Sequence, residues 1–247
     1  MFLLNLKAAI RKVAATLGLD LTQNLKYDRL TGLIIEETLA EGGVGIDVGC
    51  HKGEIFDLFI KYSPEVAHYG FEPLPHLYTA LKSKYHQHHI LPFALAEAES
   101  IATFNYVKNA PAYSGLIQRK YDIPNPLIEE IKVEVKRLDD LIHDDQGIAI
   151  LKIDVEGAEM GVLLGAKNIL AIHRPIVLFE FGLGASDVYG TSPEEMFSFF
   201  ADINYAVYKL EDYLKKPKIP LTISDFKNAY HNQGEFYFIA KVKIIPQ

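Results

Sequence analysis

The stretch GIDVGCHKGEIF, residues 45–56, predicts how the central part of the chain folds. A short apolar run contains Asp47, glycines follow at Gly49 and Gly53, and a segment of helical spacing then begins. Strand, glycine-containing turn and helix follow one another in this order where an α/β domain binds a nucleotide-like ligand. Gly49 permits close approach of a ligand to the backbone, and Gly53 lets the helix start close to the strand. Because glycines mark many turns, this loop needs support from the rest of the chain.

Strand-like and helix-like segments alternate from residue 42 onward. A capping box of Ser192 and Glu195 marks the start of one helix. The expected helices are 54–62, 76–85, 158–170 and 192–203. The expected strands are 43–49, 67–73, 89–95, 102–107, a short one within 132–142, 148–157, 175–182, 205–212 and 235–244. Proline and glycine within residues 107–130 predict a long irregular insertion.

Repeated strand–helix units predict an α/β, Rossmann-like fold with a mostly parallel sheet and helices on both faces. No convincing helix separates the last two strands, so they are expected to pair antiparallel at an edge. One domain, residues 41–247, then follows an N-terminal helical extension, residues 1–40. The extension carries an apolar stripe that favours packing on the domain or in a homodimer over lying on a membrane: Leu3, Leu6, Ile10, Val13 and Leu17.

Composition narrows the class of protein. The 247 residues include 25 basic and 32 acidic side chains, for a net charge of -7. This balance argues against nucleic-acid binding, which needs a basic face. The single cysteine, Cys50, excludes an internal disulfide and fits a reducing compartment. No run approaches the ~18 apolar residues of a membrane span, and we expect a cytoplasmic protein.

Two acids indicate which cofactor the loop binds. Asp47 stands where a dinucleotide fingerprint is neutral, and its carboxylate would repel a pyrophosphate. Glu72 ends the next expected strand, where an acid accepts hydrogen bonds from ribose hydroxyls. The two acids together fit a ligand that carries a ribose and a positive group but no phosphate. S-adenosylmethionine is such a ligand. The alternatives are that Asp47 caps a helix and that Glu72 is a solvated loop acid.

Six segments occur in the order found in FkbM-type methyltransferases: GIDVGCHKG, YGFEPLP, LPFALAE, VKRLDDLI, LKIDVEGAEMGVLLGA and PIVLFEF. The chain resembles this family over residues 43–182, with Cys50 and His51 where members often have Ala-Asn. The resemblance implies the class I methyltransferase fold, whose seven-stranded sheet has an antiparallel last strand. It also implies S-adenosylmethionine-dependent O-methylation of a hydroxyl on a sugar, polysaccharide or glycosylated natural product.

The resemblance also implies roles for single residues. The methionine part of the cofactor is assigned to Asp47 and the Gly49–Gly53 loop, the ribose to Glu72, and the adenine to Pro73 and Ala94. The complete cofactor set is Asp47, Gly49, Cys50, His51, Gly53, Glu72, Pro73 and Ala94.

Acids after the later strands are the candidates for catalysis. Asp154 is expected to be the general base or to orient the acceptor, with Glu156 second. Alternatively, Asp154 only bonds the cofactor's amino group and Glu156 caps the helix near Gly157. Asp154, Glu156 and Glu180 could instead gather a divalent cation, although no metal is expected.

The acceptor is expected to be a small molecule or a saccharide, held by Ser114, Arg119 and Glu180. Other polar groups of the insertions are further candidates: Lys120, Tyr213, Lys215 and Lys216. His86, His88 and His89 are interpreted as loop residues and not as zinc ligands. Two other functions compete, a non-catalytic S-adenosylmethionine-binding protein and a dinucleotide oxidoreductase, and the acid at Asp47 counts against the second.

Overall fold

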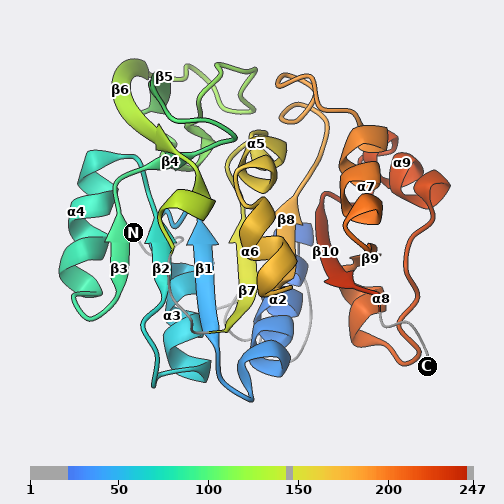
Figure 1. Ribbon diagram of the computed structural model, residues 1–247. Helices are drawn as coiled ribbons and strands as arrows, with labels where there is room; N and C mark the ends of the chain where they lie inside the picture. The colour runs from blue at the N-terminus through green and yellow to red at the C-terminus, as the bar shows by residue number, and fades with distance from the viewer. Residues whose placement is uncertain (1–21, 143–146, 244–247) are drawn as a thin grey trace, which may run out of the picture.

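The computed structural model describes residues 22–142 and 147–243. Its main sheet has seven strands in the order β3-β2-β1-β7-β8-β10-β9 (Figure 1). The sheet strands are β1 Val44–Val48, β2 Tyr69–Phe71, β3 His89–Leu91, β7 Ile148–Ile153, β8 Ile176–Glu180, β9 Tyr205–Lys209 and β10 Tyr237–Val242. The pairs from β3 to β8 are parallel, and β10 is antiparallel to β8 and β9. The expected class I methyltransferase sheet with an antiparallel last strand is confirmed.

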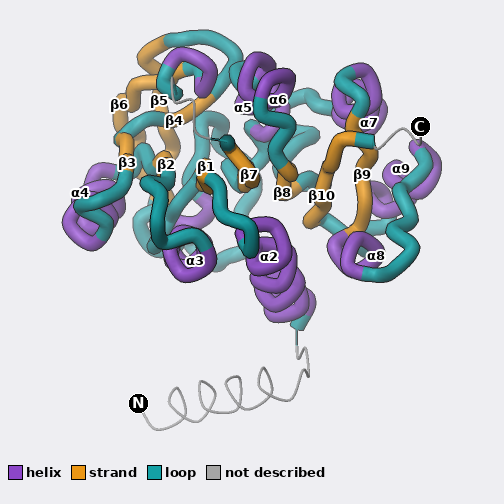
Figure 2. Tube along the Cα trace, turned by 60° about the horizontal axis from the view of Figure 1, so that its bottom comes forward, coloured by secondary structure: helices purple, strands orange, loops and turns teal. Residues whose placement is uncertain are grey.

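Helices cover both faces of this sheet, as Figure 2 shows. They are α2 Gln23–Leu39, α3 Glu54–Tyr62, α4 Pro75–Lys84, α5 Glu159–Leu164, α6 Lys167–Ile172, α7 Pro193–Asp202, α8 Leu210–Leu214 and α9 Ile223–His231. Side chains of α2, α3 and α8 pack into one apolar cluster, and those of α5, α6, α7 and α9 pack into the other. Because both faces are covered, all five residues of β1 are buried. No helix in the described residues is long and apolar enough to cross a membrane.

The N-terminal helix α2 belongs to the same core. Its side chains Leu30, Ile34, Ile35 and Leu39 are buried, and the Oγ1 of Thr22 caps its first turn. The apolar stripe predicted between Leu3 and Leu17 lies outside the described residues.

The strand expected over residues 89–95 is in fact two strands in two sheets. β3 ends at Leu91, and β4, Ala94–Leu95, joins a second sheet of three strands with β5, Ser100–Val107, and β6, Ile128–Lys136. The strand is interrupted at Pro92, because proline has no N–H to continue the hydrogen-bond ladder. The second sheet and the irregular segment 108–127 lie beyond the C-terminal ends of β1–β3 (Figure 1).

Two helix predictions also need correction. The helix expected over residues 158–170 is divided into α5 and α6 at Gly165, where a side chain would overlap the backbone oxygen of Ala96. The two last strands are separated by α8 and α9, which the sequence prediction missed. α9 has a capping box of Thr222 and Asp225, a signal that was present in the sequence. The predicted capping box of Ser192 and Glu195 at the start of α7 is confirmed.

Candidate active site

A cavity of 410 Å³ opens at the C-terminal ends of β1, β2 and β7. Ligands of doubly wound sheets bind at this edge, where the strand order changes direction. The predicted site residues that line it are Gly49, Cys50, His51, Glu72, Pro73, Ala94, Ser114, Asp154 and Glu156. Asp47, Gly53, Arg119 and Glu180 lie outside the lining. The cavity therefore brings the expected cofactor residues together with the two candidate catalytic acids.

The loop after β1 has a conformation that glycine permits. Gly49 has a φ of 84°, and a side chain there would overlap the carbonyl oxygen of Asp154. The backbone N–H groups of Gly49 and Cys50 donate to the carbonyl of Phe71, at 3.0 and 3.1 Å. Gly53, also with a φ of 84°, is the N-cap of α3. The two hydrogen bonds to Phe71 hold the loop against β2.

Glu72 is buried at the end of β2 and lines the cavity. Its carboxylate accepts hydrogen bonds from the backbone N–H groups of His51, at 2.8 Å, and Leu74, at 2.9 Å. Burial raises the pKa of Glu72 to about 7, and these two hydrogen bonds oppose the rise. The alternative of a solvated loop acid is wrong. A carboxylate has about four acceptor positions, so Glu72 can still accept from a ribose.

Asp47 is placed differently from the expectation. It is fully buried within β1 and is not a helix cap, because the N-cap of α3 is Gly53. Its Oδ1 lies 3.2 Å from Nζ of Lys152, although neither oxygen of Asp47 has a well-aligned hydrogen-bond donor among the described residues. Burial raises the pKa of Asp47, and the charge of Lys152 opposes this. Asp47 therefore lies beneath the cavity surface.

Lys152 lines the cavity and was not selected from the sequence. It is buried in β7, and its Nζ lies 3.7 Å from Oδ2 of Asp154 as well as 3.2 Å from Asp47. Burial alone would lower the pKa of Lys152, but the charges of the two aspartates raise it above its ordinary value. A lysine within the otherwise apolar run IAILKI could have indicated a buried, paired positive charge in this strand.

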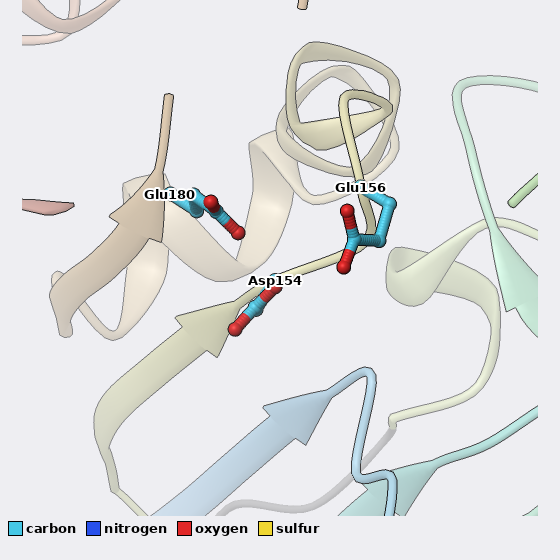
Figure 3. Close-up of side chains that lie close together, drawn as sticks. All are labelled: Asp154, Glu156 and Glu180. Atoms are coloured by element: carbon cyan, nitrogen blue, oxygen red, sulfur yellow. The ribbon is translucent and has the colours of Figure 1, made fainter. Parts of the chain in front are cut away.

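Three carboxylates converge at the ends of β7 and β8, as Figure 3 shows. Asp154, Glu156 and Glu180 each offer an oxygen within 4.8 Å of the others. Burial, followed by the charge of Asp154, raises the pKa of Glu180 well above its ordinary value. The hydroxyl of Tyr237, a second residue missed in the sequence, donates to Oδ2 of Asp154 at 3.2 Å.

Glu156 has a left-handed backbone, with a φ of 59°, and forms an ion pair with Arg119. It does not cap the following helix. The N-cap of α5 is Ala158, and the carboxylate of Glu159, the first residue of α5, accepts from the N–H groups of Val155 and Gly157 in the preceding turn. A metal ion would have to compete with Arg119 for Glu156 and with Lys152 for Asp154.

The remaining predicted residues fall into two groups. Ser114 lines the cavity, and its Oγ accepts from the N–H of Val107 at 3.0 Å. Burial lowers the pKa of His51, and burial raises the pKa of the Cys50 thiol well above its ordinary value. The other polar candidates do not line the cavity: Lys120, Tyr213, Lys215 and Lys216.

His86 and His88 lie in the loop before β3, as interpreted from the sequence, whereas His89 is the first residue of that strand. No metal-binding group among the described residues includes these histidines. His88 instead stacks on buried His68, with ring centroids 5.4 Å apart. The sequence analysis also missed Tyr27, Asp28 and Thr31, which line the cavity from α2. No local pattern placed that helix at the site.

Comparison with known proteins decides the family. The model of the methyltransferase FkbM domain matches residues 47–210 of the chain. The chain belongs to this family. The family is one of methyltransferases, and membership in it argues against the alternative of a dinucleotide oxidoreductase.

The FkbM domain is similar to the methyltransferase sdnD of Sordaria araneosa, with 30% identity over 159 residues. These are 50% of this chain and 60% of that protein. Among solved structures, methyltransferase FkbM from Methylobacillus flagellatus KT is 15% identical, with a TM-score of 0.49. The match covers 81% of this chain and 44% of that one. A putative rRNA-methylase from Clostridium thermocellum is 9% identical, with a TM-score of 0.47 and coverages of 87% and 95%.

Proposed function

We propose that the FkbM domain transfers the methyl group of S-adenosylmethionine to a hydroxyl oxygen of a sugar, polysaccharide or glycosylated natural product. The observation that carries this proposal is the carboxylate of Asp154, which lines the cavity between the donors Lys152 and Tyr237. An alcohol acceptor loses its proton as the new bond forms, and a positioned carboxylate can receive that proton.

The cofactor occupies the side of the cavity next to β1 and β2 in this proposal. Glu72 accepts hydrogen bonds from the ribose hydroxyls, and the Gly49–Gly53 loop holds the methionine part. Pro73 and Ala94 border the adenine. Three observations support this arrangement: the burial of Glu72, its two bound backbone N–H groups, and its presence in the lining.

The chain's own residues prepare the acceptor oxygen. The acceptor is held in line with the bond from sulfur to the methyl carbon, and positioning supplies much of the acceleration. As the oxygen–carbon bond forms and the carbon–sulfur bond breaks, the hydroxyl proton moves to Asp154 and S-adenosylhomocysteine leaves. Tyr237 and Lys152 hold the Asp154 carboxylate in place.

The charges of the lining support a neutral, hydroxylated acceptor. Lys152 is the lysine that lines the cavity among the described residues, and it is already paired with Asp47. Arg119 does not line the cavity and is paired with Glu156. An acidic sugar or a phosphate would therefore meet carboxylates without an available cation. Ser114 and Thr31 add polar groups to the wall.

Mass spectrometry tests this function directly. Wild-type protein is incubated with S-adenosylmethionine and a panel of neutral glycosides, amino sugars and uronic acids, and both S-adenosylhomocysteine and the product are identified. We expect a methyl ether on a neutral glycoside, its loss in Asp154→Asn, and its retention in the surface control Asp202→Asn. Methylation only at nitrogen or carboxylate, or on uronic acids in preference, would contradict the proposal.

A further inference from the structure

Lys152 is buried, and its ammonium connects three parts of the site. It donates to the carbonyl oxygen of Gly49 at 3.1 Å, and its Nζ lies 3.2 Å from Asp47 and 3.7 Å from Asp154. Asp47 is its direct neighbour in the register of β1 and β7. An ammonium group has three donors, and the bond to Gly49 uses one of them, while the two carboxylates interact with Lys152 through their charge.

The Gly49 carbonyl is a point at which the cofactor loop is bound to β7, through the side chain of Lys152. The N–H groups of Gly49 and Cys50 bind the carbonyl of Phe71, and the carbonyl of Cys50 accepts from the N–H of Gly53. These bonds fix the loop on its β2 side. The peptide that follows Gly49 is held at two points, because the N–H of Cys50 donates to Phe71 and the carbonyl of Gly49 accepts from Lys152. Removing Lys152 leaves that carbonyl without its donor and the peptide held on one side.

We propose that Lys152 is a positioning residue for the cofactor, because its ammonium holds the Gly49 carbonyl and with it the cofactor loop. Asp47 balances the buried charge of Lys152 and supports the loop from beneath the cavity. This assigns a different role to the acid that marks the loop in the sequence: Asp47 acts through Lys152. The proposal rests on the use of S-adenosylmethionine and not on the identity of the acceptor.

A purely structural role for Lys152 makes a different prediction. If Lys152 only neutralises Asp47, removing both charges together restores binding along with folding, because buried ion pairs are often replaced by apolar side chains without loss. If Lys152 positions the loop, binding stays weak until a donor returns to position 152.

Two double variants separate these roles. Asp47→Asn/Lys152→Met and Asp47→Asn/Lys152→Gln both lack the charge pair and have side chains of similar size, but glutamine retains an N–H donor. Each is titrated with S-adenosylhomocysteine by calorimetry, beside wild-type protein, after a thermal melt shows that it is folded. We expect the methionine form to bind at least about tenfold more weakly than wild type, and the glutamine form to lie between them.

Equal affinity in the two double variants, or an affinity of the methionine form close to that of wild type, would overturn the proposal. Failure of both variants to fold would also reject it, because charge balance would not then account for the role of Asp47. The titration involves no acceptor, so an acceptor screen that finds no methyl ether leaves its result intact.

Discussion

The two halves of the cavity are built in different ways. Most of the cofactor half comes from one strand–helix–strand unit, in which the loop after β1 is bound by the backbone of β2 and by the carboxylate of Glu72. Lys152 of β7 adds a long-range contact to this loop. The acceptor half is assembled from distant segments. Tyr237 reaches Asp154 across 83 positions of the chain, and Tyr27 of α2 donates to Glu235 across 208. Local sequence therefore specifies where the cofactor binds, and long-range packing shapes the acceptor side.

The largest effect is expected from a substitution that impairs the acceptor half of the cavity alone. Asp154→Asn removes the proposed base but keeps the size of the side chain. We expect the rate of methyl transfer to fall by about 10²–10⁴-fold, measured as formation of S-adenosylhomocysteine with a glycoside that wild type methylates. A rate within about threefold of wild type would show that another group takes the proton.

This difference explains which site residues could be predicted. Gly49, Gly53 and Glu72 follow from short-range spacing, because turn chemistry and strand ends are visible in a few neighbouring residues. Lys152 carried a signal that was overlooked, a charge in a buried strand. Tyr237 carried none, since only the insertion of β10 beside β8 brings its hydroxyl to Asp154.

The fold shows the same division. The order of the main strands and most helices follows from patterns along the chain. The antiparallel last strand was predicted correctly, but the absence of a helix before it was a wrong reason, because α8 and α9 lie between the last two strands. The second sheet did not follow, because the pairing of β4 with β6 joins segments separated by the insertion. The position of α2 against the cavity also depends on tertiary contacts, among them the hydrogen bond between Gln23 and the carbonyl of Gly234 at 2.8 Å.

A second prediction concerns the cofactor half. Glu72→Gln keeps the shape of the side chain but removes the charge that strengthens hydrogen bonds from a ribose. We expect affinity for S-adenosylhomocysteine to fall by roughly 10–100-fold. In wild type the affinity should rise as pH increases through about 7, where Glu72 becomes ionised, and the variant should lack this rise. Calorimetric titrations between pH 6 and 8 measure both effects, and a rise that persists in Glu72→Gln would count against the assignment.

A third prediction concerns the support beneath the cofactor half. The N–H of Gly45 donates to Nδ1 of buried His68, whose Nε2 lies 2.9 Å from the carbonyl of Ser63. Burial lowers the pKa of His68 to about 4 from the ordinary 6.5. Below pH 6.5 the unfolded state binds the proton first, so the stability contributed by neutral His68 is lost as pH falls towards 4.

The loss in the free energy of unfolding from protonation of His68 is about 2 kcal/mol at pH 4.5. Urea unfolding at pH 7 and pH 4.5 measures it as the difference between wild type and His68→Gln. The comparison with the variant is needed because burial raises the pKa of Glu159 to about 7, and that carboxyl group has the opposite pH dependence. An equal change in the free energy of unfolding for both proteins would contradict the prediction.

The smallest expected effect tests how the acceptor half is braced. Tyr237→Phe removes the hydroxyl that donates to Asp154 and keeps the ring. We expect kcat to fall by about tenfold, the value of one hydrogen bond to a charged group, with affinity for S-adenosylhomocysteine retained. Tyr208→Phe, on the neighbouring strand β9 and outside the cavity lining, is the matched control. An equal fall in both variants would indicate a general loss of packing.

The most direct test is the affinity of Asp154→Asn for S-adenosylhomocysteine, measured by calorimetry beside wild type and Glu72→Gln. If the two halves of the cavity have separate tasks, Asp154→Asn binds within about threefold of wild type although it no longer transfers a methyl group. Loss of binding in Asp154→Asn would show that this carboxylate holds the cofactor's amino group, and the assignment of Asp154 as the base would be wrong.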